Sequence, residues 1–301
     1  MQLSRRSRMH RTRIGKRLEL TARDIEIFKR LGQYRYLRST YIHAFAGGAS
    51  ETRFKERLGD LFHEGYIDRP SQQWDFAEAR YRPAVYEMGA GASRALREAG
   101  IEIGGRRTLV GEAAHRQYRH SLMICQLLAS LELGVLANPC MRFIAWPEAL
   151  SRAPEPSCTS TAPFRLPVPS GGYLVPDGLF GLEYTHGGTK AYRFFALEAD
   201  RGTMPLTRSN PGQTSYLRKM AAYDEIIAHQ VHKTDWGLPN LLVLTVTTND
   251  KRVQEIAGQL QSAAFLFKAA DDSALTTPAP HLLFEPWQRA NFPPLRIDAR
   301  G

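Results

Sequence analysis

The chain has 301 residues, enough for two ordinary domains, and its 43% hydrophobic and 23% charged residues are typical of a folded globular protein. No apolar run approaches the roughly 18 residues of a membrane span, and the three widely spaced cysteines fit neither a disulfide framework nor a zinc knuckle. Secreted, membrane-spanning and zinc-finger proteins are therefore disfavoured.

The positive charge is concentrated in the first third of the chain. Residues 1–110 contain 22 Lys and Arg against 13 Asp and Glu, a net charge of +9, whereas residues 111–301 contain 18 against 17, a net charge of +1. A basic field raises the local concentration of polyanions such as nucleic acids and speeds their capture. Ribosomal or membrane-surface binding would fit the same charge, so charge alone leaves the partner open.

Residues 1–18 form an Arg-rich start without hydrophobic periodicity. This start has no apolar stretch behind its basic residues, so it does not read as a secretory signal, and we expect a cytoplasmic protein that does not bind membranes. A charged segment of this kind is expected to be a flexible basic arm that meets a partner.

Three helices are expected between residues 20 and 64. Thr21 and Asp24 have the spacing of a capping box in front of the first helix, and a short second helix fits Ser39–Phe45. Ser50 is a suitable N-cap for a third helix over residues 51–64. The apolar residues of this third helix share one face at helical spacing, namely Phe54, Leu58, Leu61 and Phe62.

A strand, a polar turn and a second strand are expected next, over Tyr66–Arg69, PSQQWDFAEA and Arg80–Met88. Three helices followed by a hairpin predict a winged helix-turn-helix domain over residues 19–105, with its third helix in the major groove. A helical packing module without a nucleic-acid role is the alternative, but the basic charge favours binding to double-stranded DNA. The residues expected to contact that DNA are Arg38, Thr52, Arg53, Lys55, Arg57, Arg69, Arg80 and Arg82.

From residue 111 onward the pattern changes to helices alternating with strands. The expected elements are a helix over 112–133, strands over 142–146, 173–184 and 191–200, a helix over 213–231, a strand over 241–246, a helix over 252–267 and a strand over 281–284. His186-Gly187-Gly188 is a hairpin signal between the second and third strands. The order αβββαβαβ predicts an α/β sandwich with a mixed sheet over residues 111–301, and an α+β class for the whole chain.

Three carboxylates fall near the ends of two of these strands. Glu198 and Asp200 lie two residues apart, so they share a face of their strand, and the hairpin brings Asp177 beside them. Two like charges 4 Å apart repel by about 4 kcal/mol at an effective dielectric near 20, and a divalent cation would relieve this repulsion. Carboxylate oxygens suit Mg²⁺ or Mn²⁺. The alternative is a solvated strand end whose acids pair with neighbouring Lys and Arg side chains.

Pro176-Asp177 followed by Glu198-Ala199-Asp200 in an αβββαβ order resembles the PD-(D/E)xK nuclease superfamily. From about residue 18 to 267 the chain also resembles the replication-relaxation family of plasmids and mobile elements, in its winged-helix half and in the segments HRQYRH, VPDG, LEADRGT and YLRKMAAYDE. The resemblance implies a restriction-endonuclease-like fold for the second domain. It also implies action on an origin or operator together with relaxosome or replication proteins.

The same resemblance implies that Asp177 and Glu198 bind the metal ion. Asp200 stands where the nuclease motif has a lysine, and two explanations stay open: Lys219 supplies the cation instead, or Asp200 is a third ligand. His120 matches a helix histidine of the family, which would touch phosphate or relay a proton, although a structural role is the alternative. The sequence therefore predicts a magnesium- or manganese-dependent DNA nickase, with a non-catalytic regulator or relaxosome accessory as the alternative.

Overall fold

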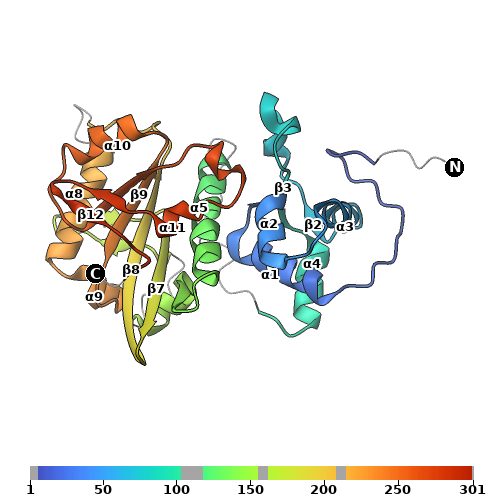
Figure 1. The fold of residues 1–301 in the computed structure, drawn as a ribbon, viewed down its shortest axis with the longest axis horizontal. Coiled ribbons are helices and arrows are strands. Elements are labelled where there is room, and N and C mark those ends of the chain that lie inside the picture. The colour runs from blue at the N-terminus through green and yellow to red at the C-terminus, as the bar shows by residue number, and fades with distance from the viewer. Residues whose placement is uncertain (1–5, 103–117, 155–161, 208–214, 300–301) are drawn as a thin grey trace. The chain divides into compact units, whose positions relative to one another are not determined.

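A computed structural model describes residues 6–102, 118–154, 162–207 and 215–299 of the chain (Figure 1). The chain divides into two compact units, one made of residues 1–129 with 276–278 and the other of residues 130–275 with 279–301. The expected domain boundary between residues 105 and 111 lies outside the described residues. The fold is of the mixed α+β class, as predicted.

The first unit combines helices with a small sheet. Its helices are α1 (Ala22–Tyr34), α2 (Ser39–Ala46), α3 (Glu51–His63), α4 (Ala90–Glu98) and the first part of α5 (Tyr118–Leu136). Its strands are β1 (Leu37–Arg38), β2 (Ile67–Asp68) and β3 (Val85–Met88), which pair antiparallel in the order β1-β3-β2. Between β2 and β3 lie two short 3₁₀ helices, η1 (Ser71–Asp75) and η2 (Ala77–Arg80).

Local sequence explains where the helices of the first unit begin and end. Thr21 and Asp24 form the expected capping box, in which each side chain accepts a hydrogen bond from the backbone N–H of the other residue. The Ser50 hydroxyl accepts a hydrogen bond from the backbone N–H of Arg53 and begins α3. Gly65, with φ of 90°, follows the end of α3 and lets the chain turn into β2.

The predicted hairpin is shorter than expected, because β3 begins at Val85 and not at Arg80. Pro70 has no N–H to continue the β2–β3 ladder. The buried side chain of Gln73 takes that place: its amide donates to the carbonyl of Val85, and its oxygen accepts from the N–H of Val85 at 2.9 Å. The segment between the strands is consequently free to coil into η1 and η2.

The second unit is built on a seven-stranded mixed sheet with the order β12-β11-β10-β9-β8-β7-β4 (Figure 1). These strands are β4 (Met141–Ala145), β7 (Gly178–His186), β8 (Thr189–Asp200), β9 (Leu242–Thr247), β10 (Phe265–Ala269), β11 (Trp287–Arg289) and β12 (Phe292–Leu295). A separate pair is formed by β5 (Leu166–Pro167) and β6 (Tyr173–Leu174). The helices are α6 (Trp146–Ala149), α8 (Tyr216–Ala228), α9 (Val231–Trp236), α10 (Asp250–Ala257) and α11 (His281–Phe284), with the 3₁₀ turns η4 (Leu150–Arg152) and η5 (Ala274–Thr276).

Strand direction follows from the connections. The strands β4, β7 and β8 form an antiparallel meander, and β7 joins β8 through Gly187 and Gly188, both of which have positive φ as the hairpin signal predicts. The helical connections α8–α9 and α10 then return the chain so that β9 and β10 run parallel to β8. From α5 to β9 the main elements therefore follow the predicted order αβββαβ.

Two predictions at the end of the chain are wrong. The expected helix over 252–267 stops at Ala257, and Phe265–Ala269 is strand β10, because a short apolar run fits helix or strand and its pairing with β9 decides the outcome. The expected strand over 281–284 is helix α11, which begins after Pro280. The strands β11 and β12 follow it, with β12 at the edge of the sheet, and were not predicted.

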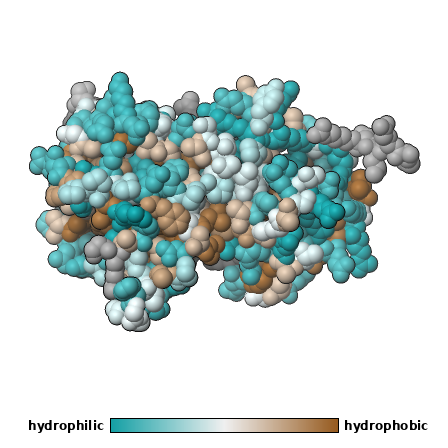
Figure 2. All heavy atoms as spheres, in the orientation of Figure 1, coloured by the Kyte–Doolittle hydropathy of each residue, from teal (hydrophilic) through white to brown (hydrophobic). Residues whose placement is uncertain are grey.

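The core of the second unit lies between its sheet and the helices α8, α9 and α10. Apolar residues of these helices join alternate strand residues such as Ala196, Val243 and Phe265 in one buried cluster. Across the described residues, no helix is both long enough and apolar enough to cross a membrane. Figure 2 shows that hydrophilic residues (teal) predominate on the visible face, with hydrophobic residues scattered among them.

Candidate functional site

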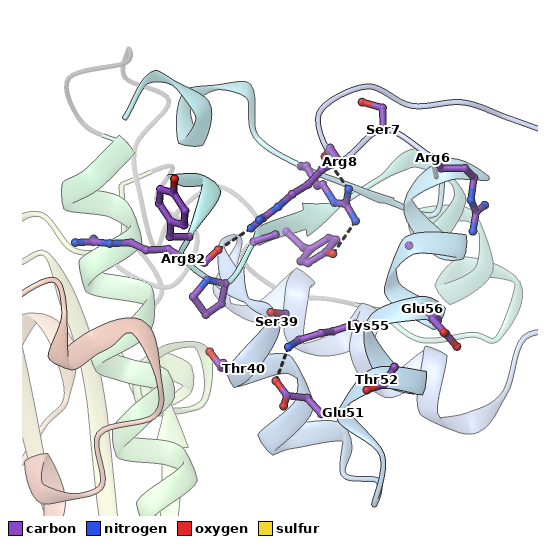
Figure 3. Close-up of a pocket in the computed structure, with 16 residues that line it drawn as sticks. Arg6, Ser7, Arg8, Ser39, Thr40, Glu51, Thr52, Lys55, Glu56 and Arg82 are labelled. Atoms are coloured by element: carbon purple, nitrogen blue, oxygen red, sulfur yellow. Dashed lines mark hydrogen bonds and ion pairs between the residues drawn. The ribbon is translucent and has the colours of Figure 1, made fainter. Parts of the chain in front are cut away.

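A groove of about 630 Å³ lies on the first unit, between α3, the start of α2, the arm and the segment before β3 (Figure 3). Five of its lining residues are cations and two are acids, namely Arg6, Arg8, Lys55, Arg69 and Arg82 against Glu51 and Glu56. Lys55 pairs with Glu51 one helical turn away, at 2.7 Å. The groove therefore carries a net positive charge and suits an anionic ligand.

The start of α3 supplies the exposed side of this groove. Thr52, Arg53 and Lys55 are all exposed, whereas Phe54 and Leu58 are buried in the unit. Thr52 and Lys55 line the groove, and Figure 3 shows both on the helix beside it. The amphipathic pattern of the helix thus directs Thr52, Arg53 and Lys55 outward.

Two of the arginines expected to contact DNA have partners inside the unit. Arg38 is only 8% exposed, and its guanidinium donates a hydrogen bond to the carbonyl of Pro83. Arg57 forms a two-point ion pair with the buried carboxylate of Asp24, at 2.6 and 3.0 Å, and also donates to the carbonyl of Glu19. Both side chains hold elements of the unit together.

Of the other expected arginines, Arg69 and Arg82 line this groove, whereas Arg80 lines a second groove formed by the arm, η1 and η2. Arg80 is exposed, and Arg82 forms an ion pair with Glu78 at 2.8 Å. Arg69 lies over the rings of Phe62 and Tyr86 and donates to the Tyr86 hydroxyl at 2.9 Å. Stacking of this kind fixes the guanidinium plane of Arg69 at the groove wall.

The described part of the arm, residues 6–18, is held against the first unit by its basic residues. Arg6 and Lys16 both pair with Asp60 near the end of α3, and Arg11 pairs with Asp68 on β2. The backbone N–H of Thr12 donates to Nδ1 of His63 at 3.0 Å. The many arginines of the arm predicted its positive charge. They did not predict where the arm lies, because each of these contacts depends on a partner elsewhere in the unit.

In the second unit, the β7–β8 hairpin brings Asp177 beside Glu198. Gly178 pairs with Leu197, so Asp177, immediately before β7, falls opposite Glu198. One carboxylate oxygen of Asp177 accepts a hydrogen bond from the backbone N–H of Ala199 at 2.9 Å. The juxtaposition that the hairpin predicts is therefore present.

Helix α8 completes this group with a cation and a phenol. Lys219 and Tyr223 lie one helical turn apart and both reach Glu198: Lys219 Nζ is 2.5 Å from one carboxylate oxygen, and the Tyr223 hydroxyl donates to the other at 2.5 Å. Lys219 Nζ also lies 3.8 Å from Asp177. We call Asp177, Glu198, Lys219 and Tyr223 the carboxylate site.

Burial and charge shift the titration of this site. Burial, together with the nearby Asp177 carboxylate, raises the pKa of Glu198 to about 7, although Lys219 partly opposes the shift. Burial disfavours the charge of Lys219, but attraction by Glu198 and Asp177 outweighs it and holds the pKa of the ammonium above its usual value. Lys219 therefore stays protonated, while Glu198 changes charge near neutral pH.

Asp200 does not converge with the other two acids, which corrects the expectation of three clustered carboxylates. It pairs with Arg252 of α10 at 2.9 Å, and its other oxygen accepts from the backbone N–H of Gly202. Arg252 also donates to the carbonyl of Met204. In the part of the chain that the structure describes, no group of three or more His, Cys, Asp or Glu side chains is arranged to hold a metal ion.

The donor set of the carboxylate site fits Mg²⁺ or Mn²⁺ with two protein carboxylates. Magnesium commonly takes one or two carboxylates and keeps water or substrate phosphate as its other ligands. The side chains of Asp177 and Lys219 are each 19% exposed, so solvent reaches the site from that side, and Glu198 is 5% exposed. Lys219 Nζ occupies the space between the two carboxylates, so binding of a divalent ion to both requires the ammonium to move.

His120 lies on α5, in the part of that helix that belongs to the first unit. Its predicted role beside the carboxylates stays a prediction. Tyr223 and Arg252 were missed as partners of the predicted acids. Tyr223 is four residues after Lys219, so the sequence indicates that the two side chains share a face of α8. Only the packing of α8 on β8 shows that this face points to Glu198.

One comparison with known proteins gives a match. The profile of a family described as replication-relaxation matches residues 28–241, which include the groove-forming helices and the carboxylate site. No curated protein and no solved structure matches the chain significantly.

Proposed function

The chain belongs to the replication-relaxation family, and we propose that it binds double-stranded DNA through its first unit. Family membership indicates a role in the replication or mobilisation of a plasmid or mobile element. In the proposal the first unit is a winged helix-turn-helix domain, with α3 as the recognition helix and the β2–β3 region as the wing. The DNA is an origin or operator of that element.

The observation that carries this proposal is the exposed start of α3 at the edge of the basic groove. Thr52, Arg53 and Lys55 project outward from a helix whose opposite face is buried. Recognition helices contact base edges with the residues of their N-terminal half. An arginine can bind guanine with two hydrogen bonds, and a threonine can contact bases through its hydroxyl and methyl groups.

The other cations of the groove suit the DNA backbone. Arg69 and Arg82 lie on the wing side and Arg6 and Arg8 on the arm side. Phosphate contacts from such residues position a duplex and give most of its affinity, while the base contacts of α3 give the specificity. Arg38 and Arg57 take no part in the proposal, because Arg38 is buried and Arg57 is bound at two points to the buried carboxylate of Asp24.

Fluorescence anisotropy with labelled duplex DNA tests the proposal. Lys55→Ala and Arg53→Ala should weaken binding and lower the dependence of affinity on salt, by about one released counterion for each phosphate that the variant no longer neutralises. Arg94→Ala and Arg97→Ala are matched controls, because both arginines are exposed on α4 of the same unit and do not line the groove. Equally weakened binding in all four variants would reject the α3 interface.

A second candidate function, nicking of the bound DNA, is supported by the meeting of Lys219 with Asp177 and Glu198. The nuclease motif has a lysine two residues after its glutamate, and here Asp200 stands in that position. Lys219 brings an ammonium to the same two carboxylates from α8. In the proposal Lys219 takes over the role of the motif lysine, and Asp200 with Arg252 holds the loop after β8.

The proposed chemistry divides between the residues of the carboxylate site. Asp177 and Glu198 would hold a magnesium or manganese ion, which would supply Lewis-acid stabilisation of charge on the scissile phosphate. Lys219 orients the attacking water and faces the negative charge that develops on the phosphate oxygens. The Tyr223 hydroxyl fixes the rotamer of Glu198. Because the pKa of Glu198 is about 7, its metal-binding form increases as the pH rises through neutrality.

The nicking proposal is tested on supercoiled plasmid carrying the native origin, in the presence of magnesium or manganese. Asp177→Asn, Glu198→Gln and Lys219→Met should each lower nicking by about a hundredfold or more, while leaving DNA binding unchanged. Asp224→Asn is the control, because Asp224 is an exposed acid next to Tyr223 on α8. If the three variants nick as the wild type does, the carboxylate site is not the nicking site. If the wild type does not nick, the second unit is a non-catalytic accessory.

A further inference from the structure

Tyr81 has the largest exposed fraction of any large hydrophobic residue in the described ranges, at 91%. It follows the last residue of η2 and lines two grooves. One is the groove beside α3, and the other, of about 810 Å³, is bounded by the arm and by η1 and η2. The ring of Tyr81 thus stands at the boundary of two cavities, each large enough for a small ligand.

The backbone that carries Tyr81 is fixed from both sides. The Arg8 guanidinium donates one hydrogen bond to the carbonyl of Arg80 at 2.7 Å and one to the carbonyl of Arg82 at 2.6 Å. The N–H groups of Tyr81 and Arg82 both donate to the carbonyl of Glu78, and the Arg82 side chain pairs with the Glu78 carboxylate. Because this backbone is already ordered, a ligand that meets the ring has to order only the side chain of Tyr81.

The surroundings of the ring are basic and aromatic. Arg6, Arg8 and Arg80 line the second groove, where Asp75 is the acid. Trp74 and Phe76 line the same groove, and the Arg8 guanidinium lies 5.5 Å from the Trp74 ring centre. Arginines interleaved with aromatic rings are the surface on which unpaired nucleotides bind, with phosphates on the cations and bases stacked on the rings.

We propose that Tyr81 is a stacking platform for an unpaired base of the bound DNA, and that this protein prefers duplexes with a locally opened segment. The inference rests on the proposed DNA binding by the first unit and adds a second ligand state to it. The α3 face holds the paired part of the DNA, and the segment around Tyr81 receives a base from the opened part. Stacking is independent of sequence, because every base has an aromatic face.

The test compares two fluorescently labelled probes, a mixed-sequence duplex and the same duplex with a short mismatched bubble that contains a fluorescent adenine analogue. The full-length wild type should bind the bubble probe about tenfold more tightly than the duplex, since one base–aromatic stack contributes a factor of this order. Binding should also quench the adenine analogue. Tyr81→Phe should keep the preference and the quenching, and Tyr81→Ala should lose both, so that its affinities for the two probes become equal.

Two further variants separate this inference from the proposed function. Lys55→Ala should weaken binding to both probes and leave the ratio of the two affinities unchanged. Tyr192→Ala, which removes an exposed tyrosine of the second unit, should behave as the wild type. The platform is rejected if Tyr81→Ala retains the bubble preference or if the wild type binds the two probes equally. If the wild type binds neither probe, both the platform and the proposed DNA binding are rejected.

Discussion

The groove of the first unit and the carboxylate site of the second unit both contain lysine, but they place it in opposite environments. Lys55 in the groove is exposed and pairs with Glu51 on the surface of α3. Lys219 in the carboxylate site is held between two acids, one of which is buried. The same residue type is therefore exposed to solvent in one place and held in a largely buried ion pair in the other.

The comparison indicates that the exposure and pairing of a cationic side chain, and not its charge alone, determine whether its loss changes ligand binding or stability. An exposed ion pair contributes little to stability because water and salt screen it. A buried pair contributes little net stability either, but breaking it leaves an uncompensated charge and is costly. Variants in the groove should therefore change DNA affinity without changing stability, and variants at the carboxylate site should change stability without changing DNA affinity.

The largest effect is expected for Lys219→Met. This change leaves Glu198 and Asp177 facing each other without a cation, so we expect the free energy of unfolding above neutral pH to fall by about 4 kcal/mol. Urea unfolding followed by circular dichroism measures it. The double variant Lys219→Met/Glu198→Gln should regain most of this stability, because the second change removes the unpaired charge. A decrease below about 1 kcal/mol for Lys219→Met would show that the pair is effectively solvated.

The pH dependence of stability is the next largest effect. Glu198 has a pKa of about 7 in the folded protein against its usual 4.5, so between these values the unfolded chain releases a proton that the folded chain keeps. The free energy of unfolding should therefore fall as the pH rises from 4.5 to 7, by about 3 kcal/mol, and level off above. Glu198→Gln should remove this slope. An unchanged slope in that variant would assign the titration to another group.

Arg57→Ala tests whether a buried ion pair of the first unit stabilises the fold more than an exposed arginine of the same unit does. Asp24 is 1% exposed, and although burial disfavours its charge, hydrogen bonds from Arg57 and Thr21 hold its pKa below the usual 3.8. Removal of the arginine should cost about 2 kcal/mol of unfolding free energy at neutral pH, less than a fully buried pair because Arg57 is partly exposed. The cost should shrink as the pH falls and Asp24 is protonated. Arg94→Ala on α4 should change stability by less than about 0.5 kcal/mol.

The smallest effect on stability is expected for the groove variant Lys55→Ala. Its partner Glu51 is exposed and remains solvated, so the free energy of unfolding should not change measurably. The pairing lowers the pKa of Glu51 through a hydrogen bond from Lys55, and this shift should disappear in the variant, as NMR titration of the carboxylate can show. A decrease in stability as large as that of Arg57→Ala would contradict the assignment of Lys55 to ligand binding.

Local signals in the sequence predicted much of this fold. The caps at Thr21 and Ser50 fixed the starts of α1 and α3, and Gly187-Gly188 fixed the β7–β8 turn. Each of these depends on a few neighbouring residues, so the sequence contains the whole interaction. Prediction failed where distant strands compete for a segment. Phe265–Ala269 becomes a strand because β9 offers it a partner, and no local pattern reveals that.

The candidate sites follow the same rule. The pairing of Asp177 with Glu198 could be predicted, because a two-residue hairpin fixes which residues face each other. The separation of Asp200 from these two acids could not be predicted, because its partner Arg252 comes from α10, 52 positions further along the chain. The exposure of Tyr81 was also hidden, since it results from the Gln73 side chain replacing part of a strand ladder and from Arg8 fixing the backbone.

Amide hydrogen exchange of the full-length protein with and without duplex DNA tests the central proposal most directly. DNA binding by the first unit predicts slower exchange in α3 and in the segment between β2 and β3, with α4 unchanged in the same sample. Slower exchange in the second unit alone, with α3 exchanging as in the free protein, would contradict the proposed interface.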